Sequence, residues 1–384
     1  MPKLLIAHGG APTAVLNASL CGAVEAARAS GRVDGVLGAR GGTRGILDGS
    51  FADLGALDAQ ALARIAGAPG SCIGTSRTPL APEDYPRMAQ SLAQAGVGYA
   101  LLTGGNGTMD ACGRLAQACA PLGIVVGGIP KTIDNDIGVI DHAPGYASAA
   151  RFAAASMRHI ARDVDSLPIH VCIVEYMGRN AGWIAAASAL SRRAPGDAPH
   201  LVLTPEVPFD EARFLASVEA VWRRGRGVVV AVSEGLRGPD GAPLAPPVFQ
   251  SGRATYYGDV SAYLTRLVIE RLGVKARSEK PGILGRCCAE LASPLDREEA
   301  RRMGALAARA VLEGRGGLMA GLLRTSDEPY ACEETLVPVA EVMLRERLMP
   351  EAFLSPDGMD VTDAFLRWAR PLLGGPLPDD GPVL

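Results

Sequence analysis

One segment of the sequence limits the possible folds more than any other. It runs Gly-Ile-Pro-Lys-Thr-Ile-Asp-Asn-Asp over residues 128–136. The residues that lead into it, Ile124 to Gly128, are apolar or small, which is typical of a buried parallel strand. Pro130 ends such a strand, because proline lacks a backbone donor and has a fixed φ. We therefore expect an open α/β sheet, in which ligands bind at the carboxyl ends of the strands.

The side chains that follow Pro130 suit phosphate chemistry. Lys131 carries a compact positive charge that can contact a phosphate oxygen. Asp134 can accept a proton from a substrate hydroxyl, and Asp136 can orient that hydroxyl or bind Mg²⁺. The alternative interpretation is a surface turn capped by Asn135. It accounts for two polar residues, but not for a lysine, a threonine and two aspartates behind a buried strand.

Two glycine-rich turns follow predicted strands and precede predicted helices. Lys3 to Ala7 leads into Gly9-Gly10, and Gly98 to Leu102 leads into the turn at 104–108. Glycine lets backbone N–H groups approach a ligand closely, and a helix N-terminus favours negative charge. One such turn alone says little, because tight strand-to-helix turns often contain glycine. The two together predict a phosphate-binding site made of Gly9, Gly10, Gly104, Gly105, Asn106, Gly107 and Thr108.

Further candidate groups for an anionic ligand occur elsewhere in the chain. Ile169 to Tyr176 predicts a strand that ends in Met177-Gly178-Arg179, where the arginine offers a planar fork for a phosphate. Gly227 to Val232 predicts another strand, which is followed by Glu234. Arg77 can bridge two phosphates at once, although an ordinary surface arginine is an equally good interpretation of that residue alone.

Length and composition favour a cytoplasmic enzyme of two domains. The chain has 384 residues, which is enough for two domains with their own cores. Its net charge of −3 indicates no nucleic-acid partner. The 8 cysteines show no zinc-ligand spacing and favour reduced thiols in the cytosol. We expect no membrane partner and no signal peptide, because no apolar run is long enough for either.

These motifs resemble the signatures of the phosphofructokinases over nearly the whole chain, from His8 to about Leu373. Residues 130–136 are similar to the family's Pro-(Gly/Lys)-Thr-Ile-Asp-Asn-Asp signature. The opening glycine turn resembles that of a pyrophosphate-using branch, and Glu-x-Met-Gly-Arg-x-Ala-Gly-Trp at 175–183 matches another family element. The resemblance implies an α/β fold of two Rossmann-like lobes with mainly parallel sheets.

The same resemblance implies a domain layout and a reaction. A phosphoryl-donor lobe is expected over 1–146 plus 285–335, and a sugar-phosphate acceptor lobe over 147–284 plus 336–384. The implied reaction is Mg²⁺-dependent phosphoryl transfer to the 1-hydroxyl of fructose 6-phosphate, giving fructose 1,6-bisphosphate in glycolysis or gluconeogenesis. Family members lead us to expect a homodimer or homotetramer.

The resemblance also assigns roles to single residues. Asp134 is expected to be the general base, and Lys131 and Arg77 are expected to stabilise charge on the transferring group. Mg²⁺ is expected to bind through Asp136 and Asn106; many relatives have an aspartate in place of this asparagine, which keeps an oxygen ligand but no charge. The acceptor is expected to contact Thr132, Asp136, Met177, Gly178, Arg179, Glu234, Arg277 and Arg286.

The phosphoryl donor is the least determined part of this hypothesis. Relatives with a lysine at the position of Lys131 use pyrophosphate, whereas the small Gly107 leaves room for a nucleotide. We give Lys131 more weight because it supplies a positive contact, and we expect pyrophosphate. ATP remains the alternative donor, and sedoheptulose 7-phosphate an alternative acceptor. Asn106, His170 and Ile283 depart from the family pattern, which leaves open a non-catalytic sugar-phosphate-binding protein of the same fold.

Overall fold

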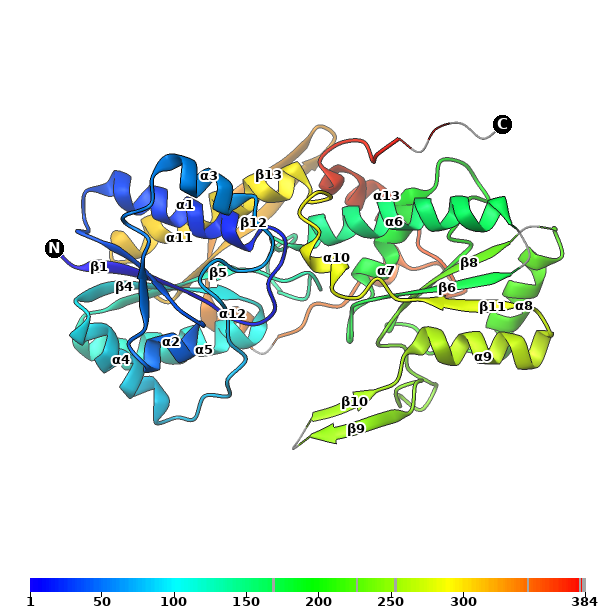
Figure 1. Cartoon of the computed structure of the whole chain (residues 1–384), viewed down its shortest axis with the longest axis horizontal. Coiled ribbons are helices and arrows are strands. Elements are labelled where there is room, and N and C mark those ends of the chain that lie inside the picture. The colour runs from blue at the N-terminus through cyan, green and yellow to red at the C-terminus, as the bar shows by residue number, and fades with distance from the viewer. Residues whose placement is uncertain (168–169, 226, 252–253, 344, 380, 382–384) are drawn as a thin grey trace. The chain divides into compact units, whose positions relative to one another are not determined.

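The computed structural model describes residues 1–167, 170–225, 227–251, 254–343, 345–379 and 381. The chain folds into two compact units, each built from two separate stretches of sequence (Figure 1). Unit 1 comprises Met1–Ser148 and Arg286–Arg347, and unit 2 comprises Ala149–Gly285 and Leu348–Leu384. Within the described ranges, no helix combines the length and the apolar character that crossing a membrane requires.

One segment lies in a different unit from the one expected. Residues 336–347 belong to unit 1 and not to the lobe predicted to bind the acceptor. The reason is that β13 (Tyr330–Pro338) pairs along its whole length with β12 (Leu318–Asp327) in unit 1. The helix that follows, α12 (Val339–Val342), then packs against α5 (Asn106–Cys119) of the same unit. A domain boundary at residue 335 would have cut this strand pair.

A seven-stranded sheet forms the centre of unit 1, with the strand order β13-β12-β5-β4-β1-β2-β3. Its inner strands run parallel, and the edge strands β3 and β13 are antiparallel to their neighbours. The inner strands are largely buried on both faces, which explains their nearly continuous apolar sequences. The other strands are β1 (Lys3–His8), β2 (Val36–Ala39), β3 (Phe51–Asp53), β4 (Val97–Gly104) and β5 (Val125–Pro130).

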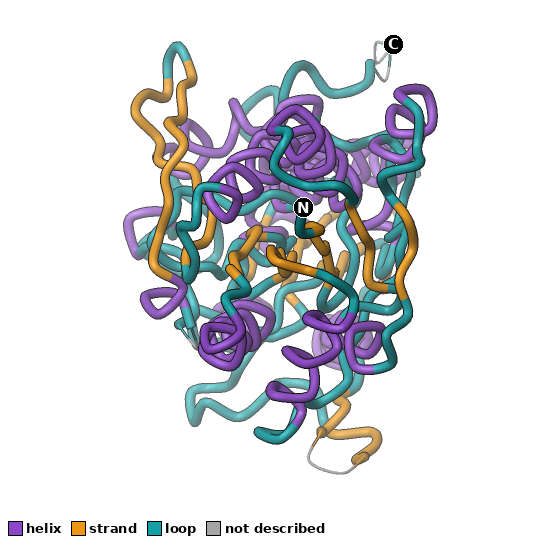
Figure 2. The backbone as a smooth tube through the Cα atoms, turned by 90° about the vertical axis from the view of Figure 1, so that its left-hand side faces the viewer, coloured by secondary structure: helices purple, strands orange, loops and turns teal. Residues whose placement is uncertain are grey.

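Helices cover both faces of this sheet; Figure 2, in which unit 1 faces the viewer, shows strands between two helical layers. One face carries α1 (Leu16–Ser30), α3 (Ala59–Ala66) and α11 (Pro294–Leu312). The other carries α2 (Thr43–Leu47), α4 (Asp84–Gln94), α12 and α5, which continues into η1 (Ala120–Leu122). Glycines bring α1 and α11 close together: a Cβ on Gly22 would lie 2.0 Å from the Arg301 carbonyl oxygen. A Cβ on Gly304 would lie 1.8 Å from that of Ser19.

A four-stranded parallel sheet, ordered β11-β6-β8-β7, forms the centre of unit 2. Its strands are β6 (Val171–Tyr176), β7 (Leu201–Leu203), β8 (Val228–Ser233) and β11 (Ala276–Glu279). Helices α8 (Glu211–Trp222) and α9 (Val260–Leu272) pack on one face, and α6 (Tyr146–Ser166) and α7 (Trp183–Ala187) lie on the other (Figure 1). The remaining elements are the hairpin β9 (Pro247–Ser251) and β10 (Ala254–Tyr257), α10 (Leu284–Cys287), α13 (Asp363–Ala369), η2 (Ser188–Ser191), η3 (Glu351–Phe353) and η4 (Arg370–Leu373).

Candidate active site

The carboxyl ends of β1, β4 and β5 bring the two glycine turns and Lys131 together. The three strands are neighbours, so the turns that follow them lie side by side at one edge of the sheet. The backbone confirms this closeness: the Gly9 N–H donates to the Thr103 carbonyl oxygen at 2.8 Å. The Lys131 N–H donates to that of Gly104 at 3.0 Å. Residues from three separate parts of the sequence thus form one continuous surface.

Close contacts require glycine at these turns. A Cβ on Gly9 would lie 2.3 Å from Thr108 Oγ1, and one on Gly104 would lie 2.2 Å from the same atom. Gly10 has a φ of +73°, a backbone conformation that residues other than glycine rarely adopt. α5 begins directly after Gly105, so the first turn of the helix presents its N-terminus, with its partial positive charge, at this edge.

Lys131 is a buried cation at the centre of this surface. Its side chain is only 5% exposed, and Nζ donates to the Ala11 carbonyl oxygen at 2.6 Å. Burial lowers the pKa of Lys131 to about 8; Asp134 opposes this shift, and the positive charges of Arg77 and Arg286 add to it. At neutral pH the ammonium form therefore still predominates. A cation with so little water around it attracts an anionic ligand more strongly than an exposed lysine does.

Asp134 lies in a tight loop that leaves the residue partly exposed. The Asp134 N–H donates to Thr132 Oγ1 at 3.0 Å, while the next residue, Asn135, is buried with a φ of +51°. Asn135 Oδ1 accepts from the Ala143 N–H at 3.1 Å. Asn135 is therefore not the cap of a surface turn: it is buried, and its side chain holds the loop in which Asp134 lies against residue 143.

Asn106 and Asp136 form a pair with spare oxygen atoms. Asn106 Nδ2 donates to the Asp136 carbonyl oxygen at 3.0 Å and to Asp136 Oδ2 at 3.2 Å. The other oxygens of the two side chains, Asn106 Oδ1 and Asp136 Oδ1, are buried and have no hydrogen-bond partner among the described residues. Carboxylate and amide oxygens are the ligands that Mg²⁺ takes from proteins, so this pair fits the cation.

Two buried side chains that were not predicted as site residues, Asn17 and His8, hold the segment that carries Arg77. Asn17 donates to the Ala68 carbonyl oxygen and accepts from the Cys72 N–H, both at 3.0 Å. His8 Nδ1 lies 2.8 Å from Ser71 Oγ; burial, with help from the Lys131 charge, lowers the pKa of this histidine to about 3. A polar residue at the end of an apolar strand, as at His8, is the signal that could have indicated such a role.

The candidate acceptor residues of unit 2 gather at the carboxyl ends of β6 and β8. Gly178 has a φ of +135°, and its N–H donates to Glu234 Oε1 at 3.4 Å. A Cβ on Gly235 would lie 1.8 Å from the Arg179 carbonyl oxygen, so the two strand-end segments touch. Met177 is half-buried beside them, whereas the Arg179 side chain is exposed and free to meet a ligand. Thr132, Asp136 and Arg286, also predicted to bind the acceptor, belong to unit 1.

Arg277 does not join this group within one chain. It lies near the start of β11 and pairs in register with Cys172, at the amino end of β6. The strand from Cys172 to Tyr176 spans about 13 Å at roughly 3.3 Å per residue. Arg277 therefore lies near the amino ends of the strands, and Arg179 lies beyond their carboxyl ends. Arg277 is 55% exposed, forms an ion pair with Glu279 at 3.1 Å and lines a pocket of about 530 Å³ together with His170.

Glu206 is a carboxylate in unit 2 that binds backbone N–H groups. Its Oε1 accepts from the Gly182 N–H at 3.0 Å and from the Met349 N–H at 3.1 Å. It thus ties the turn after Arg179 to the second stretch of unit 2.

The site as a whole indicates a class of enzyme. Helix N-terminal turns that accept anions, a buried lysine and a strand-end aspartate are typical of α/β enzymes that transfer phosphoryl groups.

Comparison with known proteins identifies the family. A family model described as phosphofructokinase matches residues 3–311, and the chain belongs to this family. A pyrophosphate–fructose 6-phosphate 1-phosphotransferase of Xanthomonas campestris is 36% identical over 98% of this chain and 92% of its own length. One from Rhodospirillum rubrum is 35% identical over 98% of this chain and 95% of its own length. The crystal structure of a pyrophosphate-dependent phosphofructokinase from Marinobacter aquaeolei has a TM-score of 0.89 at 30% identity, covering 99% of this chain and 94% of that one.

Proposed function

We propose that this protein transfers a phosphoryl group from pyrophosphate to the 1-hydroxyl of fructose 6-phosphate, in a reversible Mg²⁺-dependent reaction. The products are fructose 1,6-bisphosphate and orthophosphate. The observation that carries the proposal is the buried ammonium of Lys131 between two glycine turns. The names of the relatives above give independent support for both substrates.

Lys131 favours a small, highly charged donor. A Cβ on Gly10 would lie 3.4 Å from Lys131 Nζ, so the ammonium group lies directly against the first glycine turn. Pyrophosphate has no nucleoside to contribute binding energy, and its binding must come from charge and backbone donors. Around Gly107, by contrast, a Cβ would meet no atom within 4 Å. This space is the observation that favours ATP, and it keeps ATP as the second candidate donor.

Unit 1 supplies the acid–base group. Asp134 accepts the proton of the attacking hydroxyl, because the residue is partly exposed at a strand end and its loop is held by the Asn135 contact. Lys131 and Arg77 balance the negative charge that develops on the transferring group and on the departing phosphate. Arg77 is exposed, and its charge already acts on Lys131 in the free protein.

Asn106 and Asp136 would hold Mg²⁺ through the two buried oxygens that have no partner among the described residues. A bound Mg²⁺ supplies positive charge that offsets the charge of the phosphate oxygens. The asparagine makes the pair less negative than two aspartates would be. We therefore expect the pair to bind the free cation weakly and the cation–pyrophosphate complex more strongly.

Unit 2 supplies groups for the sugar phosphate. Arg179 offers two parallel donors to a phosphate, and Glu234 offers a carboxylate to sugar hydroxyls. Arg277 and Arg179 lie at opposite ends of the strands, so one bound sugar phosphate can meet both only if a second copy supplies Arg277. We therefore include a homodimer or homotetramer in the proposal.

One experiment tests the donor and the acceptor together. Purified protein is assayed with fructose 6-phosphate and Mg²⁺, using pyrophosphate or ATP at equal concentrations, and sedoheptulose 7-phosphate replaces the acceptor in a parallel series. We expect turnover with pyrophosphate and fructose 6-phosphate. Preference for ATP would overturn the donor assignment, and binding of the sugar phosphate without turnover with either donor would show a non-catalytic homologue.

A further inference from the structure

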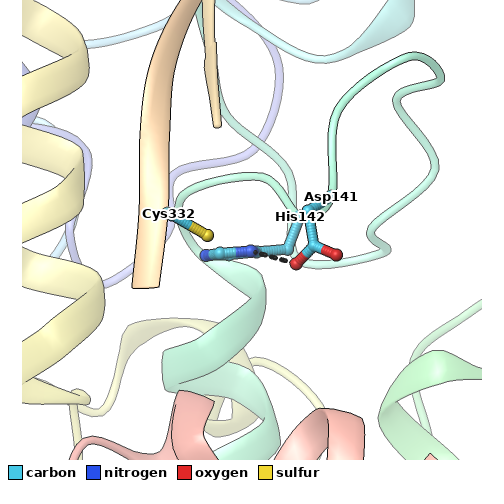
Figure 3. A group of neighbouring side chains, drawn as sticks. All are labelled: Asp141, His142 and Cys332. Atoms are coloured by element: carbon cyan, nitrogen blue, oxygen red, sulfur yellow. Dashed lines mark hydrogen bonds and ion pairs between the residues drawn. The ribbon is translucent and has the colours of Figure 1, made fainter. Parts of the chain in front are cut away.

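His142 lies fully buried between two carboxylates, on the loop that follows the candidate catalytic residues. Its Nδ1 is 2.8 Å from Asp141 Oδ2, and its Nε2 is 2.8 Å from Glu299 Oε2 on α11. Figure 3 shows the imidazole ring of His142 with Asp141 at one nitrogen and Cys332 near the other end of the ring. A carboxylate oxygen accepts hydrogen bonds, so a ring nitrogen that faces one is best used as a donor. The two carboxylates therefore favour the imidazolium form of the ring.

A proton, and not a metal ion, fits this position. Asp141, His142 and Cys332 offer ligand atoms within 4.8 Å of one another, which is close enough for a metal centre. Both imidazole nitrogens are already used by carboxylates, however, and a metal ion requires one of them as a lone pair. Burial also raises the pKa of the Cys332 thiol to about 11, which disfavours the thiolate that a metal would need.

Other charged and polar groups surround the imidazolium on every side. Tyr330 O–H donates to Glu299 Oε1 at 2.6 Å, and Arg324 Nε donates to Asp141 Oδ2 at 3.0 Å. The groups that face His142 and its two carboxylates are Tyr330 and Cys332 on β13, Arg324 and Asp327 on β12, Asp296 and Arg302 on α11, Tyr146 on α6, and Arg347 after α12. The imidazolium lies between Glu299 of α11 and Asp141 of the loop and joins the two.

The loop is joined to this cluster at several points. The Ala143 N–H, next to His142, donates to Asn135 Oδ1 at 3.1 Å, directly between the candidate base and the candidate metal ligand. The Arg347 N–H donates to the Asp136 carbonyl oxygen at 2.8 Å, and its guanidinium donates to the carbonyl oxygens of Ile140 and Asp141. A displacement of residue 142 must therefore move residues 134–136.

α11 holds the end of the same loop with a second carboxylate. Asp296, fully buried and one helical turn before Glu299, accepts from the Gly145 N–H and the Ser148 N–H, both at 2.9 Å. Residues three apart on a helix share one face, so both acids point at the loop. Asp296 fixes the backbone where α6 begins, and Glu299 fixes His142.

We propose that His142, held as an imidazolium between Asp141 and Glu299, is a positioning residue that fixes the loop carrying Asp134 and Asp136. The inference rests on the proposed function, in which Asp134 is the base and Asp136 a metal ligand. His142 itself does not touch a substrate in this scheme. It acts through Ala143 and Asn135 on the orientation of the base.

The network gives the loop a dependence on pH with a defined direction. Burial alone would lower the pKa of His142, but the hydrogen bonds and charges of Asp141 and Glu299 outweigh it and raise the pKa from 6.5 to about 9. The folded pKa exceeds the unfolded one, so the stabilisation is complete below about 6.5. It is lost as the pH rises through about 9, and the loop loosens on the alkaline side.

The test compares Glu299→Gln with Glu298→Gln, which makes the same change on the exposed neighbouring residue of α11. Removing one carboxylate lowers the pKa of His142, so the alkaline limb of kcat should move down by about one pH unit or more. We expect kcat at pH 7.5 to fall about tenfold, and KM for both substrates to change less than about threefold. The profile uses kcat because bound pyrophosphate keeps Lys131 protonated. Loss of the Lys131 proton then does not contribute to the alkaline limb, which reports on His142.

Two outcomes contradict the proposal. If Glu299→Gln keeps the alkaline limb and the kcat of Glu298→Gln, His142 does not position the loop. An NMR titration of the 5 histidines in the unmodified protein, with His142→Gln for assignment, should show one ring that titrates near 9; a value near 6.5 for His142 overturns the inference. This measurement is independent of turnover. A third outcome separates the two proposals. If the protein has no activity with any donor, but His142 shows this titration and Glu299→Gln has faster amide exchange over 131–145, only the proposed function is refuted.

Discussion

Replacement of Lys131 by methionine should separate its charge from its volume. The methionine keeps most of the buried stem and removes only the ammonium, which in the parent is 5% exposed and bonded to the Ala11 carbonyl oxygen. Loss of one preorganised charge contact to the transition state typically lowers turnover by about 10² to 10³. We expect kcat/KM for pyrophosphate to fall by at least about a hundredfold, because a charge with so little water around it is only weakly screened.

The pH profile provides a second measurement on the same group. Burial holds the pKa of Lys131 at about 8, so the charged form, and with it kcat/KM for pyrophosphate, should fall as the pH rises above about 8. Each further unit removes about nine-tenths of the remaining ammonium. Lys131→Arg stays charged throughout and should lose this limb even if its activity is lower.

The assay is the initial rate with each donor across pH 6 to 9, for parent, Lys131→Met and Lys131→Gly. Lys131→Gly also opens space beside Gly10, and the surroundings of Gly107 are already open, so this variant should show a smaller loss with ATP than with pyrophosphate. Undiminished pyrophosphate activity in Lys131→Met would refute the reasoning from the buried charge. A parent that prefers ATP would refute the donor assignment and leave the fold untouched.

Three further substitutions test single roles. Asp134→Asn should keep sugar-phosphate binding but lower kcat by about two to four orders of magnitude, as expected for a positioned base; turnover within a few-fold of the parent would exclude that role. Arg179→Ala should raise KM for the sugar phosphate about tenfold or more, whereas Arg223→Ala, at a side chain 75% exposed in the same unit, should leave it unchanged. Asp136→Asn should raise the Mg²⁺ concentration needed for half-maximal rate severalfold while thermal stability stays close to the parent's; an unchanged Mg²⁺ requirement would remove Asp136 from the metal site.

Local sequence patterns predicted the strands that carry the candidate site. β1, β4 and β5 could be located to within a few residues, because each is a short apolar run that ends at a glycine turn or at Pro130. The chemistry at their ends followed, because parallel strands present their carboxyl ends at one edge. The family resemblance was confirmed by the comparisons with known proteins.

Contacts between distant parts of the chain could not be predicted in this way. Nothing near His142 in the sequence indicates that its partner is Glu299, more than a hundred residues away on α11. The family resemblance assigned both Arg277 and Arg179 to the acceptor, but the register of β11 on β6 puts Arg277 near the amino end of β6 and Arg179 beyond its carboxyl end. Strand register depends on which side chains pack together in three dimensions, and a linear pattern does not contain it.

The contact between α1 and α11 has a consequence for the order in which this chain can fold during synthesis. α1 emerges early, yet the apolar residues of α11 that complete its face of the core, such as Met303 and Val311, are made after the whole of Ala149–Gly285. Until then the part of this face that α11 covers stays exposed. Domains commonly fold one after another from the N-terminus as the ribosome works. Here unit 1 has to wait for α11, and a nascent chain that stops before residue 294 exposes an unfinished core to chaperones and proteases.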